Sequence, residues 1–412
     1  MLGVFPRLSA YFTVILLVTC IGGPIYIWAL WNHSDHFQDL SSVGGDFLYF
    51  YDSAKLAVMG KAEALMNYAG ASPVYDSGRN YYSWVFPPSF LAILLPFSTF
   101  SFLNGYLLWF GLSLVVFLAS CSGYLHPLRR SIFLLFAPAT LVVLFFGQSG
   151  LLVAAILCGG LRLIDNRPAL GGLLLGFMFI KPELALLIPF ALIAQGNIIG
   201  FCTMLTSAGL TVVGSVLLFG APAWLNYLDT GPQALFSLLT SADSVSLQLM
   251  PSIYGAMRLL GFSGSLALVV MGVSFLAALS ITFWLFLTPR EHSSRNLAFG
   301  LCCLLASPLV FLWDLAIVVP LMFIFACKSK VFDNVLGSSY TGAALLMGVY
   351  LLPLVGFGLA AHGFPIGPFV LISALAYLLY DLMVQKRAAR AAMAEARSEN
   401  LHIPDAASSQ RS

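Results

Sequence analysis

Charged residues are scarce in this chain of 412 residues. Asp, Glu, Lys and Arg make up 9% of it, against 60% hydrophobic residues, and the mean hydropathy is +0.93. A soluble globular protein carries about 25% charged residues, so this composition excludes that class. The apolar runs are also too numerous to fill one buried core. We therefore expect an all-α polytopic membrane protein, in contact with membrane lipids.

Other absences narrow the function. The net charge of +2 provides no basic field for a nucleic acid, so no nucleic-acid partner is expected. The seven cysteines lie inside apolar runs without a CxxC or Cys/His spacing, which excludes a disulfide framework and a zinc site and indicates small packing residues. Neither a GxGxxG loop nor a Walker loop is present, which argues against nucleotide-driven chemistry. No cofactor and no metal are expected.

Several apolar runs are long enough to cross a bilayer. The first, residues 11–31, exceeds the h-region of a secretory signal and is expected to be an uncleaved span. Further spans are predicted at 104–122, 131–147, 149–163, 198–220, 264–287, 337–357 and 364–385. Two other stretches, 169–195 and 296–327, are interrupted by proline at Lys181-Pro182-Glu183 and Ser307-Pro308, and each predicts a pair of short helices. With segment 86–97 taken as a partial crossing, 11–13 transmembrane helices are expected.

The loop charges predict an orientation. Loop 32–85 holds six acids against three bases and follows a first span that runs from inside to outside, so it is placed outside, as is a second loop at 222–261. The remaining basic clusters favour the cytoplasmic side: Arg129-Arg130, Arg162/Arg167, Arg290/Arg295 and Lys328/Lys330. We expect one membrane domain over residues 1–385, a charged cytoplasmic tail at 386–412, and a multi-pass location in the cell membrane.

The outer loop contains the first candidate for chemistry, Asp46 in the run Gly44-Gly45-Asp46-Phe47-Leu48-Tyr49-Phe50-Tyr51. Two glycines allow a tight turn and a close approach to a ligand. A carboxylate there can act as a general base on a hydroxyl. The alternative is structural, because an Asp that precedes an aromatic helix is often its N-cap. The residues alone leave both roles open.

Three further residues break apolar stretches, where polar groups are functional candidates. Lys181 can bind a phosphate, or it can simply pair with Glu183. Asp314 is either a substrate-binding group or a hydrogen-bonded structural carboxylate. Gln148, in Gly147-Gln148-Ser149-Gly150, is either part of a tight turn or a partner for a sugar hydroxyl. Arg79, an outer-loop cation, is a second candidate for binding a phosphate.

The arrangement of these motifs resembles glycosyltransferase family 87, the polyprenyl-phosphate-mannose-dependent α-mannosyltransferases of the GT-C superfamily. The run Gly45–Tyr51 is similar to the acidic motif of their first outer loop, and Phe86-Pro87-Pro88 is similar to a Tyr-Pro-Pro segment. Three further pieces follow in order: Phe146–Leu152, Leu170–Gly176 leading to Lys181-Pro182, and Ser307-Pro308 leading to Trp313-Asp314-Leu315. The chain departs from the family at 309–313, where members often carry a His and this sequence has none.

The resemblance implies a GT-C-like fold and a membrane glycosyltransferase whose active site faces outside. A polyprenyl-phosphate sugar, expected to be mannose, would be the donor, and a hydroxyl of a lipid or glycan would be the acceptor. Asp46 would be the general base, and the transfer would invert the anomeric centre to give an α-glycoside. Lys181 and Arg79 would bind the donor phosphate, whereas Tyr49, Tyr51, Gln148 and Asp314 would contact substrate.

Two readings from other classes compete with a transferase. A transporter or flippase of the envelope-glycan pathway predicts charges spread through the membrane midplane and a visible internal repeat. In this sequence the candidate charges gather toward the outer ends of the spans, and no repeat is evident. A structural subunit of a polysaccharide complex would use the acidic loop only to bind a partner. Replacing Asp46 by Asn distinguishes both readings from the transferase.

Overall fold

The computed structural model describes residues 44–66, 84–125, 129–240, 244–329 and 339–401. Every regular element in these residues is a helix, and no strand occurs among them. The predicted all-α fold class is therefore confirmed. The predicted first span, residues 11–31, lies outside the described residues.

Five helices in the described part of the chain are long and apolar enough to cross a membrane. Their apolar parts have 19 to 23 residues, which at about 1.5 Å per residue matches a hydrocarbon core about 30 Å thick. They are α7 (Phe102–Ser120), α14 (Ile198–Phe219), α18 (Gly264–Phe286), α21 (Ser339–Ala361) and the first half of α22 (Gly367–Leu401).

The surfaces of these long helices are apolar rather than polar. On α14, Leu210 and Leu217 are 63% and 82% exposed, and Val273 on α18 is 63% exposed. Exposed leucine and valine at this density suit contact with lipid tails and not with water. The chain is a multi-pass membrane protein.

Both predicted proline breaks are present. Stretch 169–195 forms α11 (Pro168–Gly176), a 3-10 turn η2 (Phe177–Ile180), α12 (Pro182–Ala185) and α13 (Ile188–Ala194). Stretch 296–327 forms α19 (His292–Leu305), a 3-10 segment η3 (Leu312–Val318) and α20 (Val319–Lys328). The residue before a proline avoids the helical region of backbone conformation, so the helix ends there. Each of these two stretches therefore turns back within the bundle.

One predicted span is wrong in detail. Residues 131–147 do not form a single helix but two, α8 (Arg129–Leu135) and α9 (Pro138–Phe146). Ala137 is extended, with φ −60° and ψ 136°, because Pro138 follows it. The next predicted span is present as α10 (Gly150–Leu163).

The loop regions are more helical than their charge suggests. The acidic loop contains α4 (Gly45–Val58) and α5 (Ala62–Met66). Segment 86–97 becomes α6 (Pro88–Ser98), whose 11 residues extend about 16 Å and cannot cross a bilayer alone. The second loop is not irregular but forms α15 (Ala221–Thr240), α16 (Ser244–Gln248) and α17 (Ile253–Leu259).

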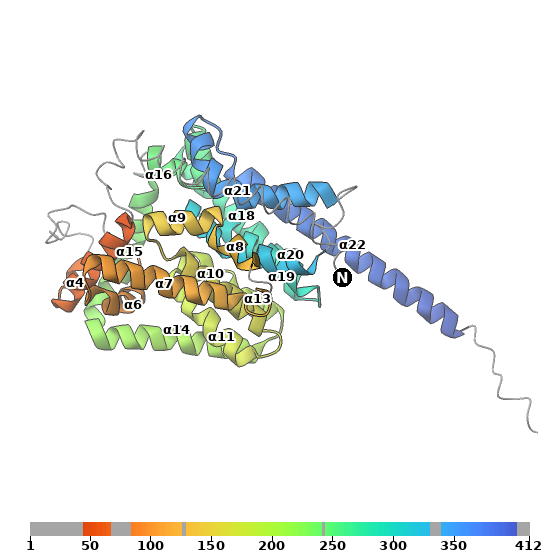
Figure 1. Ribbon diagram of the computed structural model, residues 1–412, viewed down its shortest axis with the longest axis horizontal. Coiled ribbons are helices and arrows are strands. Elements are labelled where there is room, and N and C mark those ends of the chain that lie inside the picture. Colours follow the sequence, from red (N-terminus) through yellow and green to blue (C-terminus); the bar gives the residue numbers. More distant parts are fainter. Residues whose placement is uncertain (1–43, 67–83, 126–128, 241–243, 330–338, 402–412) are drawn as a thin grey trace, which may run out of the picture.

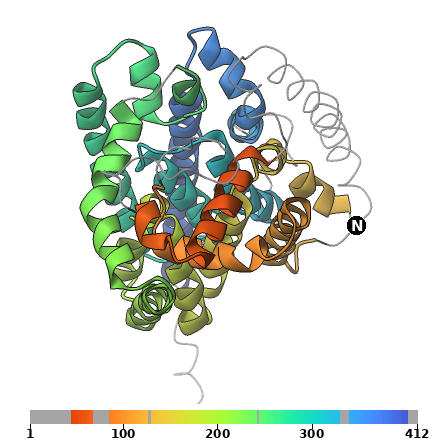
Figure 2. The same ribbon diagram turned by 90° about the vertical axis from the view of Figure 1, so that its left-hand side faces the viewer.

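The helices give the bundle two distinct ends. In Figure 1 the long helices run roughly from left to right, with α4 and α6 at the left end and α19 and α20 nearer the right. Figure 2 looks onto the left end, where α4 lies across the front of the bundle. Helix α22 continues through residue 385 and projects beyond the right end, so the predicted membrane domain and tail share one helix.

Helices α11 and α14 approach each other closely through glycine. A Cβ atom on Gly172 would lie 2.1 Å from Thr203 Oγ1, and one on Gly176 would lie 1.8 Å from Ser207 Oγ. Small residues four apart allow close packing of membrane helices, where side chains rather than water must fill the interface. This contact fixes α11, which leads directly to Lys181.

The cysteines are only partly the packing residues that were predicted. Cys121, Cys158, Cys302 and Cys303 are buried, as expected. The prediction is wrong for Cys202 and Cys327, which are exposed on the helix surface. In a membrane protein an apolar run can face lipid as readily as the core, and the sequence does not distinguish the two.

Candidate active site

Two glycine turns bring distant parts of the chain into contact at the left end of the bundle. Gly44 and Gly147 both adopt the left-handed conformation, with φ +85° and +77°. The Gly44 amide donates to the Phe145 carbonyl at 2.8 Å. A Cβ atom on Gly147 would lie 2.6 Å from Phe47 Cβ, so glycine is required there for both its conformation and its size.

This crossing places Gln148 beside Asp46. Gln148 Nε2 donates to Asp46 Oδ2 at 2.7 Å, across 102 residues of sequence. Asp46 is half-buried in the first turn of α4, and Gln148 is buried. The N-cap of α4 is Gly44, and no side chain caps that helix end. The alternative role of Asp46 as an N-cap is therefore wrong.

Burial raises the pKa of Asp46 to about 6, although the Gln148 hydrogen bond and the positive charge of Lys181 both oppose this shift. A carboxyl group surrounded by protein atoms loses hydration, and this disfavours its charged form. A base is most effective when its pKa lies near the working pH. Asp46 thus has the position and the proton affinity of a general base.

Lys181 pairs with a carboxylate that its local sequence does not indicate. Its Nζ forms a hydrogen-bonded ion pair with Asp314 Oδ1, and the two residues are 4% and 0% exposed. Asp314 Oδ2 also accepts from the Phe311 amide at 2.9 Å, at the start of η3. Asp314 is therefore fully buried and hydrogen-bonded, and it fixes the position of the lysine ammonium group.

The turn around Gln148 also contacts the segment that carries Asp314. A Cβ atom on Gly150 would lie 2.5 Å from the Trp313 carbonyl oxygen, so only glycine permits this approach. The Phe146 and Trp313 rings have centroids 5.0 Å apart. One turn thus connects Asp46 on one side with the Lys181–Asp314 pair on the other, which explains why the lysine charge acts on Asp46.

The predicted tyrosines face different surroundings. Tyr51 is buried, and its hydroxyl donates to the Phe100 carbonyl at 2.8 Å. It follows Asp46 by five positions, about 140° around the helix, so α4 directs it away from the carboxylate. Tyr49, three positions after Asp46, lies nearer the same side and packs on Trp84 with ring centroids 5.4 Å apart. Arg79 lies outside the described residues.

Two further polar groups, Glu183 and Tyr227, lie near the Lys181–Asp314 pair. The sequence predicts Glu183 only as a partner for Lys181. In the structure the charges of both Lys181 and Asp314 affect how readily the Glu183 carboxyl group loses its proton. The charge of Glu183 in turn affects how readily the Tyr227 hydroxyl, on α15, loses its proton. The signal for Glu183 was its place directly after the Lys-Pro break, whereas nothing local in the sequence indicated Tyr227.

Gln148 retains an unused hydrogen-bonding atom. Its side-chain oxygen Oε1 is buried and has no hydrogen-bond partner among the described residues. A buried acceptor without a donor is costly, so a substrate hydroxyl is the group it suits. Among the described residues, no three His, Cys, Asp or Glu side chains are grouped to hold a metal ion.

A comparison with protein-family models decides the class. The model of glycosyltransferase family 87 matches residues 84–312, more than half of the 412-residue chain. The chain belongs to glycosyltransferase family 87. The match includes Gln148 and Lys181, while Asp46 lies before it and Asp314 two residues after it. No curated protein and no solved structure matches this chain.

Membership of this family and the apolar helix bundle together show a membrane glycosyltransferase, as the motifs had predicted. The protein is therefore an enzyme that transfers a sugar from a donor to an acceptor. The roles of the individual residues stay predictions, as does the absence of a metal.

Proposed function

We propose that the protein transfers mannose from a polyprenyl-phosphate donor to a hydroxyl of a lipid or glycan acceptor, with inversion and with Asp46 as the general base. The observation that supports this most is the half-buried Asp46 carboxylate, oriented by Gln148 and close enough to Lys181 for that cation to act on it. A base and a cation held together in a membrane protein are what this reaction requires.

The bond changes balance without another reactant. Asp46 accepts the proton of the acceptor hydroxyl while the acceptor oxygen forms a bond to the anomeric carbon. The bond from that carbon to the phosphate oxygen breaks, and the electron pair leaves with the polyprenyl phosphate. Because the acceptor attacks opposite the leaving group, a β-linked donor gives an α-glycoside.

Lys181 is suited to stabilise the leaving phosphate. An ammonium group has three N–H donors, and Asp314 accepts from one of them. The other two can be offered to phosphate oxygens as their negative charge develops. Since the family's frequent histidine is missing from 309–313, Lys181 takes over the contact to the donor phosphate in this proposal.

We place the active site on the outer face of the cell membrane. Arg162, Arg295 and Lys328 lie on α10, α19 and α20, and Arg167 and Arg290 lie just outside α11 and α18. All five are at helix ends opposite Asp46. Basic residues favour the cytoplasmic side. The Asp46 end then faces outward, where polyprenyl-linked sugars meet glycan acceptors.

Sugar transfer in membranes tests this proposal. Membranes with wild-type protein, Asp46→Asn or Asp52→Asn, at matched protein levels, receive radiolabelled polyprenyl-phosphate mannose. Asp52 is a second half-buried acid on α4, so its variant controls for a lost charge on the same helix. We expect labelled product from wild type and Asp52→Asn and none from Asp46→Asn.

Other results would change the proposal in defined ways. Equal product from Asp46→Asn would remove Asp46 from catalysis. Product with a lipid-linked pentose but not with mannose would correct the sugar and keep the mechanism. No transfer from any polyprenyl-phosphate sugar would contradict the proposed donor class.

A further inference from the structure

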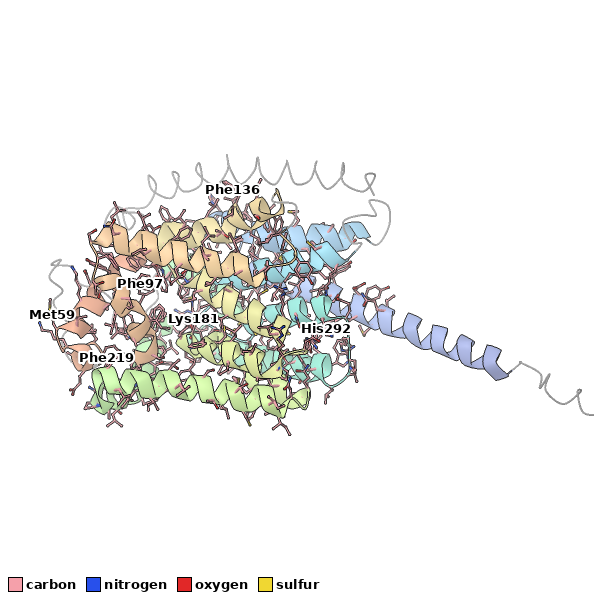
Figure 3. The ribbon with its side chains drawn as sticks, turned by 60° about the horizontal axis from the view of Figure 1, so that its bottom comes forward. Met59, Phe97, Phe136, Lys181, Phe219 and His292 are labelled. Atoms are coloured by element: carbon pink, nitrogen blue, oxygen red, sulfur yellow. The ribbon has the colours of Figure 1, made fainter. Side chains whose placement is uncertain are left out.

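A polar cavity lies at the opposite end of the bundle from Asp46. Its volume is about 210 Å³, and its polar lining includes Arg162 of α10, His292, Ser293 and Asn296 of α19, and Lys328 of α20. His292 and Lys328 are exposed, so the cavity opens to the surface. In Figure 3 His292 lies toward one end of the bundle, Met59 marks the other, and Lys181 lies between them.

Arg162 is a fixed cation in this cavity. Its guanidinium donates to the Ser120 carbonyl and, at 2.8 Å, to the Ser122 carbonyl. It also lies 5.2 Å from the centroid of the Tyr124 ring, which lines the cavity as well. A guanidinium has five N–H donors, so some of them stay available to a ligand while Arg162 donates to the two carbonyls. A cation held in place in this way loses little side-chain entropy on binding.

The other charged groups add to a positive surface. Lys328 ends α20 on the rim of the cavity, and no Asp or Glu is among the lining residues. The nearest acids already have partners. Asp165 accepts from Arg295 at 2.7 Å and lies 3.0 Å from His292 Nδ1, while Glu291 caps α19 by accepting from the Ser294 amide at 2.7 Å.

The position and size limit the ligand. The cavity is smaller than the roughly 300–1,000 Å³ of sites for drug-sized molecules, and therefore too small for a lipid-linked sugar. It lies at the ends of α10, α19 and α20, at the end of the bundle where basic residues gather. Basic pockets between helix ends bind phosphorylated headgroups.

We propose that this cavity binds a phosphate group, carried by an anionic phospholipid headgroup or free in solution. Arg162 and Lys328 supply the charge, and Asn296, whose Nδ2 donates to the Leu161 carbonyl, keeps a second N–H for the phosphate. Ser293 lines the cavity but already donates to Glu291 Oε2. This site is separate from the candidate active site and does not depend on the proposed donor or on Asp46.

Lipid titration of the purified protein tests the proposal. The wild type, Lys328→Gln, Arg162→Gln and the double variant are titrated in detergent with phosphatidylglycerol or with phosphatidylcholine of the same acyl chains, and bound lipid is counted by native mass spectrometry. Lys61→Gln is the matched control, an exposed lysine at the far end of the bundle. A parallel titration uses inorganic phosphate alone.

We expect one more phosphatidylglycerol than phosphatidylcholine on the wild type. Each lost cation should weaken that binding about fivefold and the double variant about 25-fold, while Lys61→Gln has no effect. Lys328 is on the surface, so its variant remains informative if Arg162→Gln fails to fold. The same losses with inorganic phosphate, and none with lipid, would identify free phosphate as the source. Equal binding of both lipids and of phosphate to the wild type and the double variant would overturn the proposal.

Discussion

Asp46 and Asp165 are both carboxylates, at opposite ends of the helix bundle, yet their surroundings differ. Asp165 accepts two hydrogen bonds from Arg295, at 3.1 and 2.7 Å, and one from Gln195 at 2.6 Å. Among the described residues, Asp46 accepts one side-chain hydrogen bond, from Gln148. Both carboxylate oxygens of Asp165 accept hydrogen bonds from side chains, whereas Asp46 Oδ1 accepts none from a described side chain and can accept one from a substrate.

The pKa values follow from this difference. Burial raises the pKa of Asp46 to about 6, because a single amide and a nearby cation do not offset the lost hydration. Burial also acts to raise the pKa of Asp165, but Arg295, His292 and Gln195 together outweigh it and hold that pKa below its usual value. A carboxylate whose oxygens all accept hydrogen bonds holds helices together. A carboxylate with an oxygen that accepts none is available for proton transfer.

The largest effect on stability is expected from Lys181→Met. It leaves Asp314 buried without a counter-charge, so the free energy of unfolding in detergent should fall by about 3–5 kcal/mol. The double variant Lys181→Met/Asp314→Asn should recover most of that stability while sugar transfer stays lost. A Lys181→Met protein as stable as wild type would show that the ion pair does not matter to the fold.

Asp165→Asn should have the next largest effect. It removes the charge that pairs with Arg295, whose side chain is 5% exposed, and should lower the free energy of unfolding by about 2 kcal/mol. Sugar transfer per folded molecule should be unchanged. Asp229→Asn, which alters an exposed acid on α15, is the control and should change neither quantity. Lost transfer in a stable Asp165→Asn protein would remove the contrast between the two acids.

Gln148→Leu should reduce sugar transfer about tenfold, since it removes one hydrogen bond to a charged group. The Gln148 contact lowers the pKa of Asp46, so its loss should move the acidic midpoint of the pH–rate profile upward. The profile of transfer rate against pH measures both effects. A lower rate with an unmoved midpoint would mean that Gln148 binds substrate without acting on Asp46.

The remaining prediction concerns pH in the wild type. Transfer should fall about tenfold per pH unit below a midpoint near 6, because only the ionised Asp46 accepts a proton. Between about pH 4 and 6 the folded protein keeps a proton on Asp46 that the unfolded chain loses, so the Asp46 contribution to stability declines as pH rises through this window. Asp165 behaves oppositely: its contribution is complete above about pH 4 and is lost as pH falls below that. A flat rate between pH 5 and 7 would exclude Asp46 as the base.

Much of the fold follows from local sequence. Proline fixes the breaks at Pro182 and Pro308, and the hydropathy locates the long helices, because both act within a few residues. The helices of 222–261 were not predicted, because exposed polar residues such as Asp229 and Gln233 interrupt the apolar ones and give the segment the composition of a loop.

The candidate site was only partly predictable. The sequence predicts four of the site residues, because each is polar in apolar surroundings: Asp46, Gln148, Lys181 and Asp314. The pairing of Lys181 with Asp314 cannot be predicted from the local sequence, because the two residues are 133 positions apart and Glu183 is the acid nearest to Lys181 along the chain. The orientation of Tyr51 was missed for a related reason: a motif gives residue types, while the helix turn decides which of them face the carboxylate.

Measuring sugar transfer and thermal unfolding together on Asp46→Asn and Asp165→Asn tests the central contrast most directly. Asp46→Asn should lose transfer by a factor of about 10²–10⁴ and unfold at the wild-type temperature or above it, since a poorly solvated charge is removed. Asp165→Asn should unfold earlier and keep its transfer rate. The opposite pattern, an active but unstable Asp46→Asn beside a stable but inactive Asp165→Asn, would contradict the assignment of catalysis to one end of the bundle and of structural pairing to the other.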